Sequence, residues 1–222
     1  VIYTRAGPEI GVAATKTFTT QIVAMYLLAM DLATQSRVMS AQARRSMVGQ
    51  LRNLPRAVQD VLNKAEEVEE LAKRYHSVKD MYFIGRNINY PIALEGALKT
   101  KEISYIHGEG FPAGELKHGP LALISKESPV VAIAVKDHTY EKMLGNISEV
   151  TARGSPVIAI GYEGDTELRK YADEVLTVRE VPPVFSPVPV IVTLQLLSYY
   201  LARERGCPVD KPRNIAKTVT VE

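Results

Sequence analysis

The chain has 222 residues, of which 46% are hydrophobic and 23% charged, a composition typical of a globular protein with one large domain, or one domain and part of another. Its 27 Lys and Arg residues against 25 Asp and Glu give a formal net charge of +2, which is too balanced for a nucleic-acid-binding protein. The single cysteine, Cys207, excludes an internal disulfide, and no Cys/His cluster has the spacing of a metal site.

These features lead us to expect a cytoplasmic protein that needs no metal or cofactor and binds neither nucleic acid nor membrane. The longest apolar stretch, Pro189 to Leu201, is shorter than the roughly 20 residues that span a bilayer, so it predicts a buried helix. The sequence begins with Val1 rather than Met, from which we expect a piece of a longer protein.

The first 75 residues predict helices and almost no sheet. Val1 to Thr4 resembles the end of a strand, and Gly7, Pro8 and Gly11 then indicate a loop. Helical spacing of apolar residues, with Pro55 as a helix terminator, predicts helices over 15–32, 41–54 and 58–75. Residues 1–55 are therefore expected to be the end of a preceding domain.

After His76 the pattern changes to short apolar runs that alternate with helical segments. The predicted strands are 81–84, 130–135, 157–160 and 175–178, and the predicted helices are 91–106, 139–153, 167–171 and 190–203. Fully apolar strands that alternate with helices indicate a parallel sheet covered on both faces, so residues 76–205 predict one doubly wound α/β domain. The glycine-rich segment from Gly108 to Gly114 predicts a loop.

One predicted helix carries three charged residues on a single face. Glu95, Lys99 and Glu102 are spaced i, i+4, i+7, and this pattern is common in solvent-exposed ion-pair ladders that contribute a few tenths of a kcal/mol, about 0.3 per pair. A functional interpretation competes with it, because the helix begins just beyond the carboxyl end of a strand, where α/β sheets bind ligands. The spacing alone leaves both interpretations open.

Two more residues have a plain and a functional interpretation. His118 lies at a loop or a helix end, where it either caps a helix C-terminus or acts as a general acid/base, since histidine titrates near neutral pH. Lys217 lies near the end of the chain and is either a solvated charge or, if it is buried, a nucleophile for Schiff-base chemistry.

Four separated segments, in order along the chain, resemble the glutamine–fructose-6-phosphate aminotransferases, also called glucosamine-6-phosphate synthases. They are Ala6 to Ala13, Pro91 to Ile106, Gly114 to Pro120 and Asp210 to Glu222. The resemblance implies tandem sugar isomerase (SIS) domains behind a glutaminase domain, each SIS domain being a five-stranded parallel sheet flanked by helices. It implies the truncated end of the first SIS domain in 1–55, the second in 56–207, and a tail that contributes to the sugar site in 208–222.

The resemblance also implies an activity, the conversion of fructose 6-phosphate, with ammonia from glutamine, to glucosamine 6-phosphate. It implies that His118 opens the sugar ring in a neighbouring subunit's site, that Lys217 forms a Schiff base with the open-chain ketone, and that Glu102 moves a proton between C1 and C2. Lys99 resembles the partner of that base. The expected partners are a sugar-phosphate substrate and a second copy in a homodimer. Further positions that match residues near the sugar are Val12, Ala13, Ala14, Asn214 and Ala216.

The sequence departs from the family in places. Ala14 stands where close relatives usually have serine, and the family's phosphate-binding Ser/Thr loops and glutaminase cysteine have no counterpart here. Two alternatives are a SIS-only glucosamine-6-phosphate deaminase or isomerase and a non-catalytic SIS module that binds a sugar phosphate. A binding module has no need of Glu102, His118 and Lys217 together, which disfavours the second.

Overall fold

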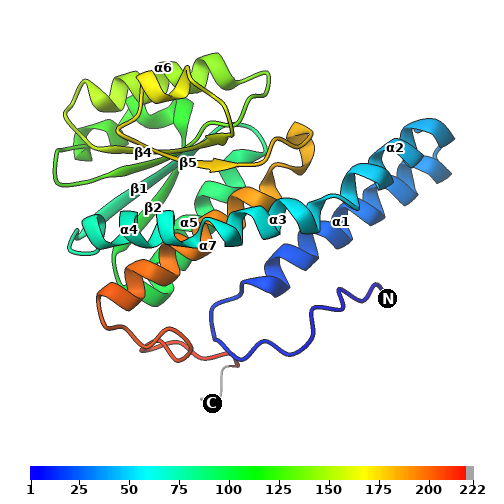
Figure 1. Ribbon diagram of the computed structural model, residues 1–222, viewed down its shortest axis with the longest axis horizontal. Coiled ribbons are helices and arrows are strands. Elements are labelled where there is room, and N and C mark those ends of the chain that lie inside the picture. Colours follow the sequence, from blue (N-terminus) through cyan, green and yellow to red (C-terminus); the bar gives the residue numbers. More distant parts are fainter. Residues whose placement is uncertain (219–222) are drawn as a thin grey trace.

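The computed structural model describes residues 1–218 and contains a five-stranded parallel sheet in the order β2-β1-β3-β4-β5 (Figure 1). The strands are β1 (Asp80–Gly85), β2 (His107–Pro112), β3 (Val130–Ile133), β4 (Val157–Tyr162) and β5 (Glu174–Val178). Every residue of β3 and β4 is buried, which explains their uninterrupted apolar sequences, because both faces of the sheet are covered. The predicted α/β class and sheet type are confirmed.

Helices form a layer on each face of the sheet (Figure 1). One core cluster joins one face of the sheet to α3 (Leu54–Asn63), α4 (Ala65–Tyr75), α5 (Asn89–Ser104) and α7 (Pro187–Glu204). The second cluster joins the other face to α6 (Tyr140–Thr151) and to short 3-10 helices. The 3-10 helices of this second cluster are η1 (Ala113–His118), η2 (Pro120–Leu123) and η3 (Leu168–Lys170), whereas η4 (Pro183–Phe185) contributes Phe185 to the first cluster.

The helix α7 is more apolar and longer than the sequence pattern predicts. Within residues 1–218, the segment Pro183–Glu204 is long and apolar enough to cross a membrane by length and composition alone. In the fold, however, 72% of its most apolar window is buried, and it packs against α5 and α4. The predicted buried helix is therefore confirmed, although the expected shortness of the apolar stretch is wrong.

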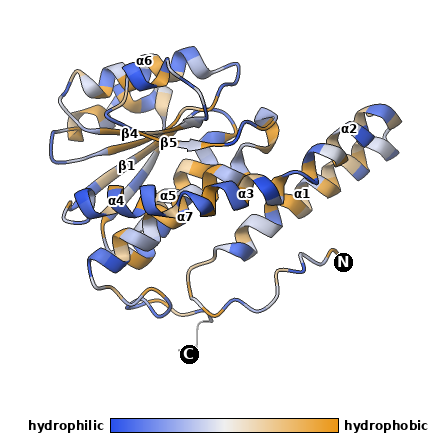
Figure 2. Cartoon of the chain, in the orientation of Figure 1, coloured by the Kyte–Doolittle hydropathy of each residue, from blue (hydrophilic) through white to orange (hydrophobic). Residues whose placement is uncertain are grey.

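Two helices, α1 (Lys16–Gln35) and α2 (Ala41–Leu51), form a hairpin that projects away from the sheet (Figure 1). Phe18, Ile22 and Tyr26 of α1 pack against the main core, and the Tyr26 ring meets Phe185 edge to face with ring centroids 5.0 Å apart. Apolar residues further along α1, whose ribbon has the hydrophobic colour in Figure 2, remain exposed, among them Leu32. The first 55 residues are thus attached to the sheet domain through the first half of α1, with further contacts from Met47, Leu51 and Leu54.

Several predicted boundaries are wrong for identifiable reasons. Residues 1–10 have no regular structure, so the predicted strand at 1–4 is absent. The predicted helix 58–75 is two helices, α3 and α4, separated at Lys64, whose ammonium reaches across to Glu163 and Thr177. Pro55 lies in the first turn of α3, which begins at Leu54, rather than closing α2, because proline fits the first turn of a helix. The predicted helix 167–171 is the single 3-10 turn η3.

The largest error concerns the glycine-rich segment that was predicted to be a loop. His107–Pro112 forms the edge strand β2, which pairs in parallel with β1 from Asp80 to Gly85. A Cβ atom added to Gly108 would lie 2.7 Å from the Ala97 carbonyl oxygen, so the glycine allows α5 to pack directly on the strand. The glycines here therefore serve close helix packing rather than a turn. Residues 219–222, the end of the tail that the resemblance assigns to the sugar site, lie outside the described residues.

Candidate functional site

The charged face of α5 forms a buried cluster that we call the helix cluster: Glu95, Lys99 and Glu102. The Lys99 ammonium nitrogen lies 2.6 Å from Glu102 Oε2 and 3.3 Å from Glu95 Oε1. The side chains are 3%, 13% and 22% exposed for Lys99, Glu95 and Glu102 respectively. The interpretation of these residues as a solvent-exposed ladder is therefore wrong, because α7 and β2 cover the helix on which they lie.

Burial has different consequences for the two carboxylates of the helix cluster. Burial raises the pKa of the Glu95 carboxyl above its ordinary value, and the Lys99 ammonium opposes that rise. Glu102 Oε2 is buried and lies close to the ammonium, but it accepts no well-directed hydrogen bond from residues 1–218. Glu102 is thus a charge-paired carboxylate with a free acceptor, a suitable arrangement for a group that takes up a proton.

The tail contributes a second lysine–glutamate pair, which we call the tail clamp: Glu9, Gly11 and Lys217. The Lys217 ammonium donates hydrogen bonds of 2.9 Å to Glu9 Oε2 and of 2.9 Å to the Gly11 carbonyl oxygen. The Lys217 side chain is 46% exposed, whereas that of Glu9 is 6% exposed. The Schiff-base interpretation of the sequence required a buried lysine. In the structure Lys217 is exposed, and its partner Glu9 is the buried member of the pair.

Glu9 also organises the beginning of α1. Its Oε1 accepts hydrogen bonds from the Thr15 and Thr17 backbone amides, at 2.9 and 3.3 Å, and so satisfies free donors at the helix N-terminus. Desolvation by burial acts to raise its pKa, but the Thr17 hydroxyl, these amides and Lys217 together lower the pKa of Glu9 to about 2. Sequence reasoning overlooked Glu9, although it lies within one of the matched segments.

The loop before α1 and the tail lie together over the C-terminal end of α5. The Val12 amide donates a 3.0 Å hydrogen bond to the Asp210 carbonyl oxygen, and Ala13 packs on Ile103, the neighbour of Glu102. At the same end of α5, the Arg213 amide donates to the Tyr105 hydroxyl at 2.8 Å, while its guanidinium lies 4.2 Å from the ring centroid. These contacts bring segments from both ends of the chain to the helix that carries Glu102.

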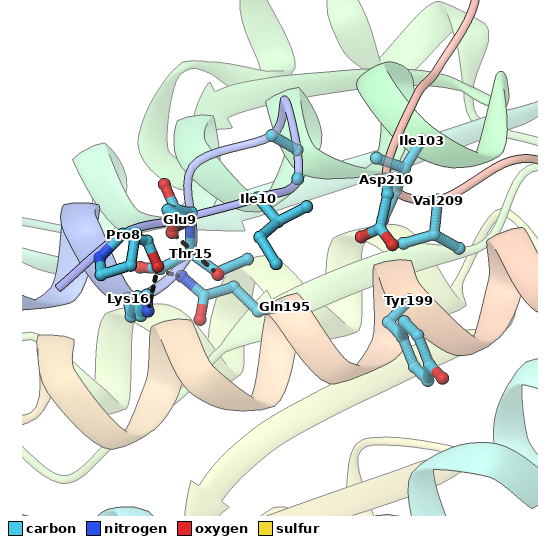
Figure 3. A pocket seen from close by; sticks show the side chains of 12 residues that line it. Pro8, Glu9, Ile10, Thr15, Lys16, Ile103, Gln195, Tyr199, Val209 and Asp210 are labelled. Carbon is cyan, nitrogen blue, oxygen red and sulfur yellow. Dashed lines mark hydrogen bonds between the residues drawn. The ribbon is translucent and has the colours of Figure 1, made fainter. Parts of the chain in front are cut away.

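A cavity of about 370 Å³ opens between the loop, α7 and the tail (Figure 3). Its volume is within the range of small-ligand sites. Ala13 is the predicted substrate-binding residue that lines it. The other lining residues are Pro8, Glu9, Ile10, Gly11, Thr15, Lys16, Ile103, Gln195, Tyr199, Val209 and Asp210. The cavity therefore adjoins the tail clamp and the end of α5.

The remaining predicted substrate-binding residues occupy the same two segments but do not converge on one point. Val12 and Ala14 are half-buried in the loop, and Asn214 and Ala216 are exposed in the tail. Asn214 has a φ of 62°, a left-handed conformation that asparagine adopts more readily than most residues. These positions are thus gathered at one end of α5 without closing around a ligand.

His118 lies away from Glu102, on the other face of the sheet. It is exposed at the end of η1, which follows the carboxyl end of β2 and packs through Leu116 into the cluster around α6. The helix α5 covers the opposite face, and Glu102 lies near the beginning of β2. A six-residue strand spans roughly 20 Å, so Glu102 and His118 of one chain do not share a site.

Residues 74–205 match the family model for the SIS domain. The chain belongs to the SIS domain family. All 222 residues align at 55% identity with the isomerizing glutamine–fructose-6-phosphate aminotransferase of Methanosarcina acetivorans, although they cover only 36% of that relative. The chain therefore spans about a third of the length of such curated relatives.

Solved structures of SIS proteins have the same architecture. The C-terminal domain of glucosamine-fructose-6-phosphate aminotransferase from Francisella tularensis superposes with a TM-score of 0.89 at 40% identity, covering 92% of this chain and 58% of that one. Glucosamine-6-phosphate deaminase from Thermotoga maritima superposes with a TM-score of 0.65 over 96% of this chain and 59% of that one. Its identity is 23%, so this second likeness concerns the fold alone. Within residues 1–218 no three His, Cys, Asp or Glu side chains gather as a metal site.

Proposed function

We propose that the chain is the isomerase part of a glutamine–fructose-6-phosphate aminotransferase and acts on fructose 6-phosphate in the cytoplasm. The proposal rests mainly on the buried Lys99–Glu102 pair near the C-terminal end of α5. The loop before α1 and the tail that carries Lys217 both contact that end of the helix. The 55% identity to an aminotransferase along the whole chain favours this activity over that of the deaminase, for which the likeness is one of fold.

The proposed chemistry assigns one step to each side chain. His118 assists ring opening by moving the proton between the ring oxygen and the anomeric hydroxyl. The neutral amine of Lys217 adds to the C2 carbonyl and, with loss of one water, forms a Schiff base that ammonia then displaces, leaving its nitrogen on C2. Glu102 takes a proton from C1 and delivers one to C2, while Lys99 stabilises the charge that develops on the sugar oxygen.

The proposal includes a domain organisation and an assembly. Residues 1–55 are proposed to be the end of a first SIS domain, 56–207 the second, and 208–222 a tail that joins the sugar site. Because Glu102 and His118 lie on opposite faces of the sheet, a complete site requires His118 from a second copy, and we propose a homodimer. Sedimentation of the full-length protein tests it, and a monomer at the concentration of full activity would contradict it.

The decisive experiment measures glucosamine 6-phosphate formation by the full-length protein that contains this chain. Glu102→Gln keeps the size of the side chain but cannot accept the proton, so kcat should fall about 10²–10⁴-fold. The matched control is Glu115→Gln, an exposed glutamate on η1, which should retain wild-type kcat. Retention of wild-type kcat by Glu102→Gln would overturn the role of Glu102. Release of ammonia from glucosamine 6-phosphate without glutamine-dependent synthesis would favour the deaminase instead.

A further inference from the structure

We propose that Glu9 is a positioning residue for Lys217: its carboxylate holds the tail lysine in place beside the site and connects the tail to the beginning of α1. This inference rests on the proposed function, because it assigns to Glu9 the placement of the lysine that would form the Schiff base. The residue pair is separated by 208 positions in the chain, so the contact brings the two ends of the described region together.

The two oxygens of the Glu9 carboxylate have separate tasks. Oε1 accepts the Thr15 and Thr17 amides and the Thr15 hydroxyl, the last at 3.2 Å, so it satisfies the backbone donors of the helix terminus. Oε2 accepts the Thr17 hydroxyl at 2.5 Å and the Lys217 ammonium at 2.9 Å. Helix capping needs Oε1, and the lysine occupies Oε2, so holding the lysine is a function beyond capping.

The clamp has a fixed side and a movable side. Glu9 is 6% exposed and is held by the threonines at the beginning of α1, whereas Lys217 is 46% exposed and belongs to a tail without regular structure. A fixed acceptor that holds an exposed lysine sets where that lysine rests. The Gly11 carbonyl oxygen gives the ammonium a second fixed acceptor, which restricts its position further.

The resting contact also keeps Lys217 unreactive. An ammonium that donates to a carboxylate and a carbonyl has no lone pair with which to attack a ketone. Glu9 is a weak base, since its pKa is lowered to about 2, so it holds the lysine rather than deprotonating it. In this arrangement the lysine must leave Glu9, or lose its proton to another group, before it reacts.

The test measures how fast an amine-acylating reagent labels Lys217 in the 222-residue chain, with Lys211 as the internal reference. Both lysines are exposed in the same tail, so their ratio, read by peptide mass spectrometry, removes the effect of general tail mobility. Glu9→Gln keeps a carbonyl oxygen for the helix but loses the charge, and it should raise the Lys217/Lys211 labelling ratio at least fivefold. Glu9→Asp, which keeps the charge but shortens the side chain, should raise the ratio by less.

The matched control is Thr17→Val, which removes a hydroxyl bond to Glu9 and weakens the helix start without removing the lysine's partner. Its labelling ratio should stay within twofold of wild type. An unchanged ratio in Glu9→Gln, or an equal rise in Thr17→Val, would overturn the proposal, because either result makes Glu9 a helix cap alone.

A second readout links the clamp to the chemistry. In the full-length protein incubated with fructose 6-phosphate and cyanoborohydride, reduction of the Schiff base should mark Lys217. Glu9→Gln should reduce this marking several-fold, because the released lysine is more accessible to a small reagent but no longer rests beside the sugar site. Wild-type protein in which Lys217 is never marked would contradict the proposed function, while the acylation ratio still tests the clamp itself. Equal marking of wild type and Glu9→Gln would instead contradict the positioning role.

Discussion

The helix cluster and the tail clamp both pair lysine with glutamate, yet they are built in opposite ways. In the helix cluster the cation is buried, at 3% exposure, between two carboxylates of the same helix. In the tail clamp the anion is buried and the cation is exposed at the far end of the chain. The first geometry is set by the helical repeat, and the second by a contact between distant segments.

This difference suits different tasks in the proposed reaction. A proton-transfer group must stay within hydrogen-bond reach of two adjacent carbons, which a buried pair on a packed helix provides. A lysine that forms and releases a covalent bond to its substrate must move, which an exposed side chain on an irregular tail permits. The rigid part of the proposed site thus lies on α5 and the movable part in the tail.

The largest expected effect comes from removing the buried cation. Lys99→Ala leaves Glu95 and Glu102 close together without their shared partner, so we expect a loss of about 3–5 kcal/mol in the free energy of unfolding. Urea denaturation followed by circular dichroism measures it. Lys101→Ala, an exposed neighbour on the same helix, should change stability by less than about 0.5 kcal/mol.

A triple variant tests the reason for the stability loss expected in Lys99→Ala. Adding Glu95→Gln and Glu102→Gln to Lys99→Ala removes the unpaired charges and should restore part of the lost stability, because the cost lies in burying carboxylates without a cation. If Lys99→Ala were as stable as Lys101→Ala, the helix cluster would be no more than a solvated ladder.

The sequence predicts the rigid region better than the movable one. Apolar runs located β1, β3, β4 and β5, and the i, i+3 spacing placed Lys99 beside Glu102. The pattern does not predict the strand β2, because its glycines are needed for the close packing of α5 on the strand. This is a tertiary contact that the local sequence does not reveal. The burial of Lys99 was likewise hidden, since it depends on α7, about 90 positions further along the chain.

The tail clamp could not be predicted at all from local pattern. Glu9 and Lys217 each appear as isolated charges in irregular segments, and 208 positions separate them. Resemblance to a family identified Lys217 as a candidate but gave no partner for it. The opposite placement of His118 and Glu102 also required the sheet, because which face a crossover helix covers follows from strand order.

The tail clamp should lose stability in acid. The pKa of Glu9 is about 2 in the fold against an ordinary 4.5, so its contribution to stability is present above pH 4.5 and is lost as the pH falls toward 2. Wild type should exceed Glu9→Gln by about 1–2 kcal/mol at pH 7, after allowance for the solvent around Lys217, and this difference should shrink between pH 4.5 and 2.

Urea titrations of the two proteins at a series of pH values measure that difference. Thr17→Val, compared with wild type in the same way, keeps the carboxylate but loses the hydroxyl that helps to lower its pKa, so it should retain only part of the acid-sensitive contribution. A difference between wild type and Glu9→Gln that stays constant from pH 7 to pH 2 would show that the charge of Glu9 does not stabilise the fold.

The smallest effect is expected where the tail meets α5 without any ion pair. Tyr105→Phe removes the hydroxyl that accepts the Arg213 amide but keeps the ring beneath the guanidinium, so the tail contact should weaken by about 1 kcal/mol or less. Trypsin should then cleave after Arg213 or Lys217 about two- to fivefold faster, since 1 kcal/mol corresponds to roughly a fivefold change in the open population. Tyr171→Phe, beyond β4 in the sequence, is the control. Equal cleavage of both variants would mean that the clamp alone holds the tail, and that the movable lysine has one anchor rather than two.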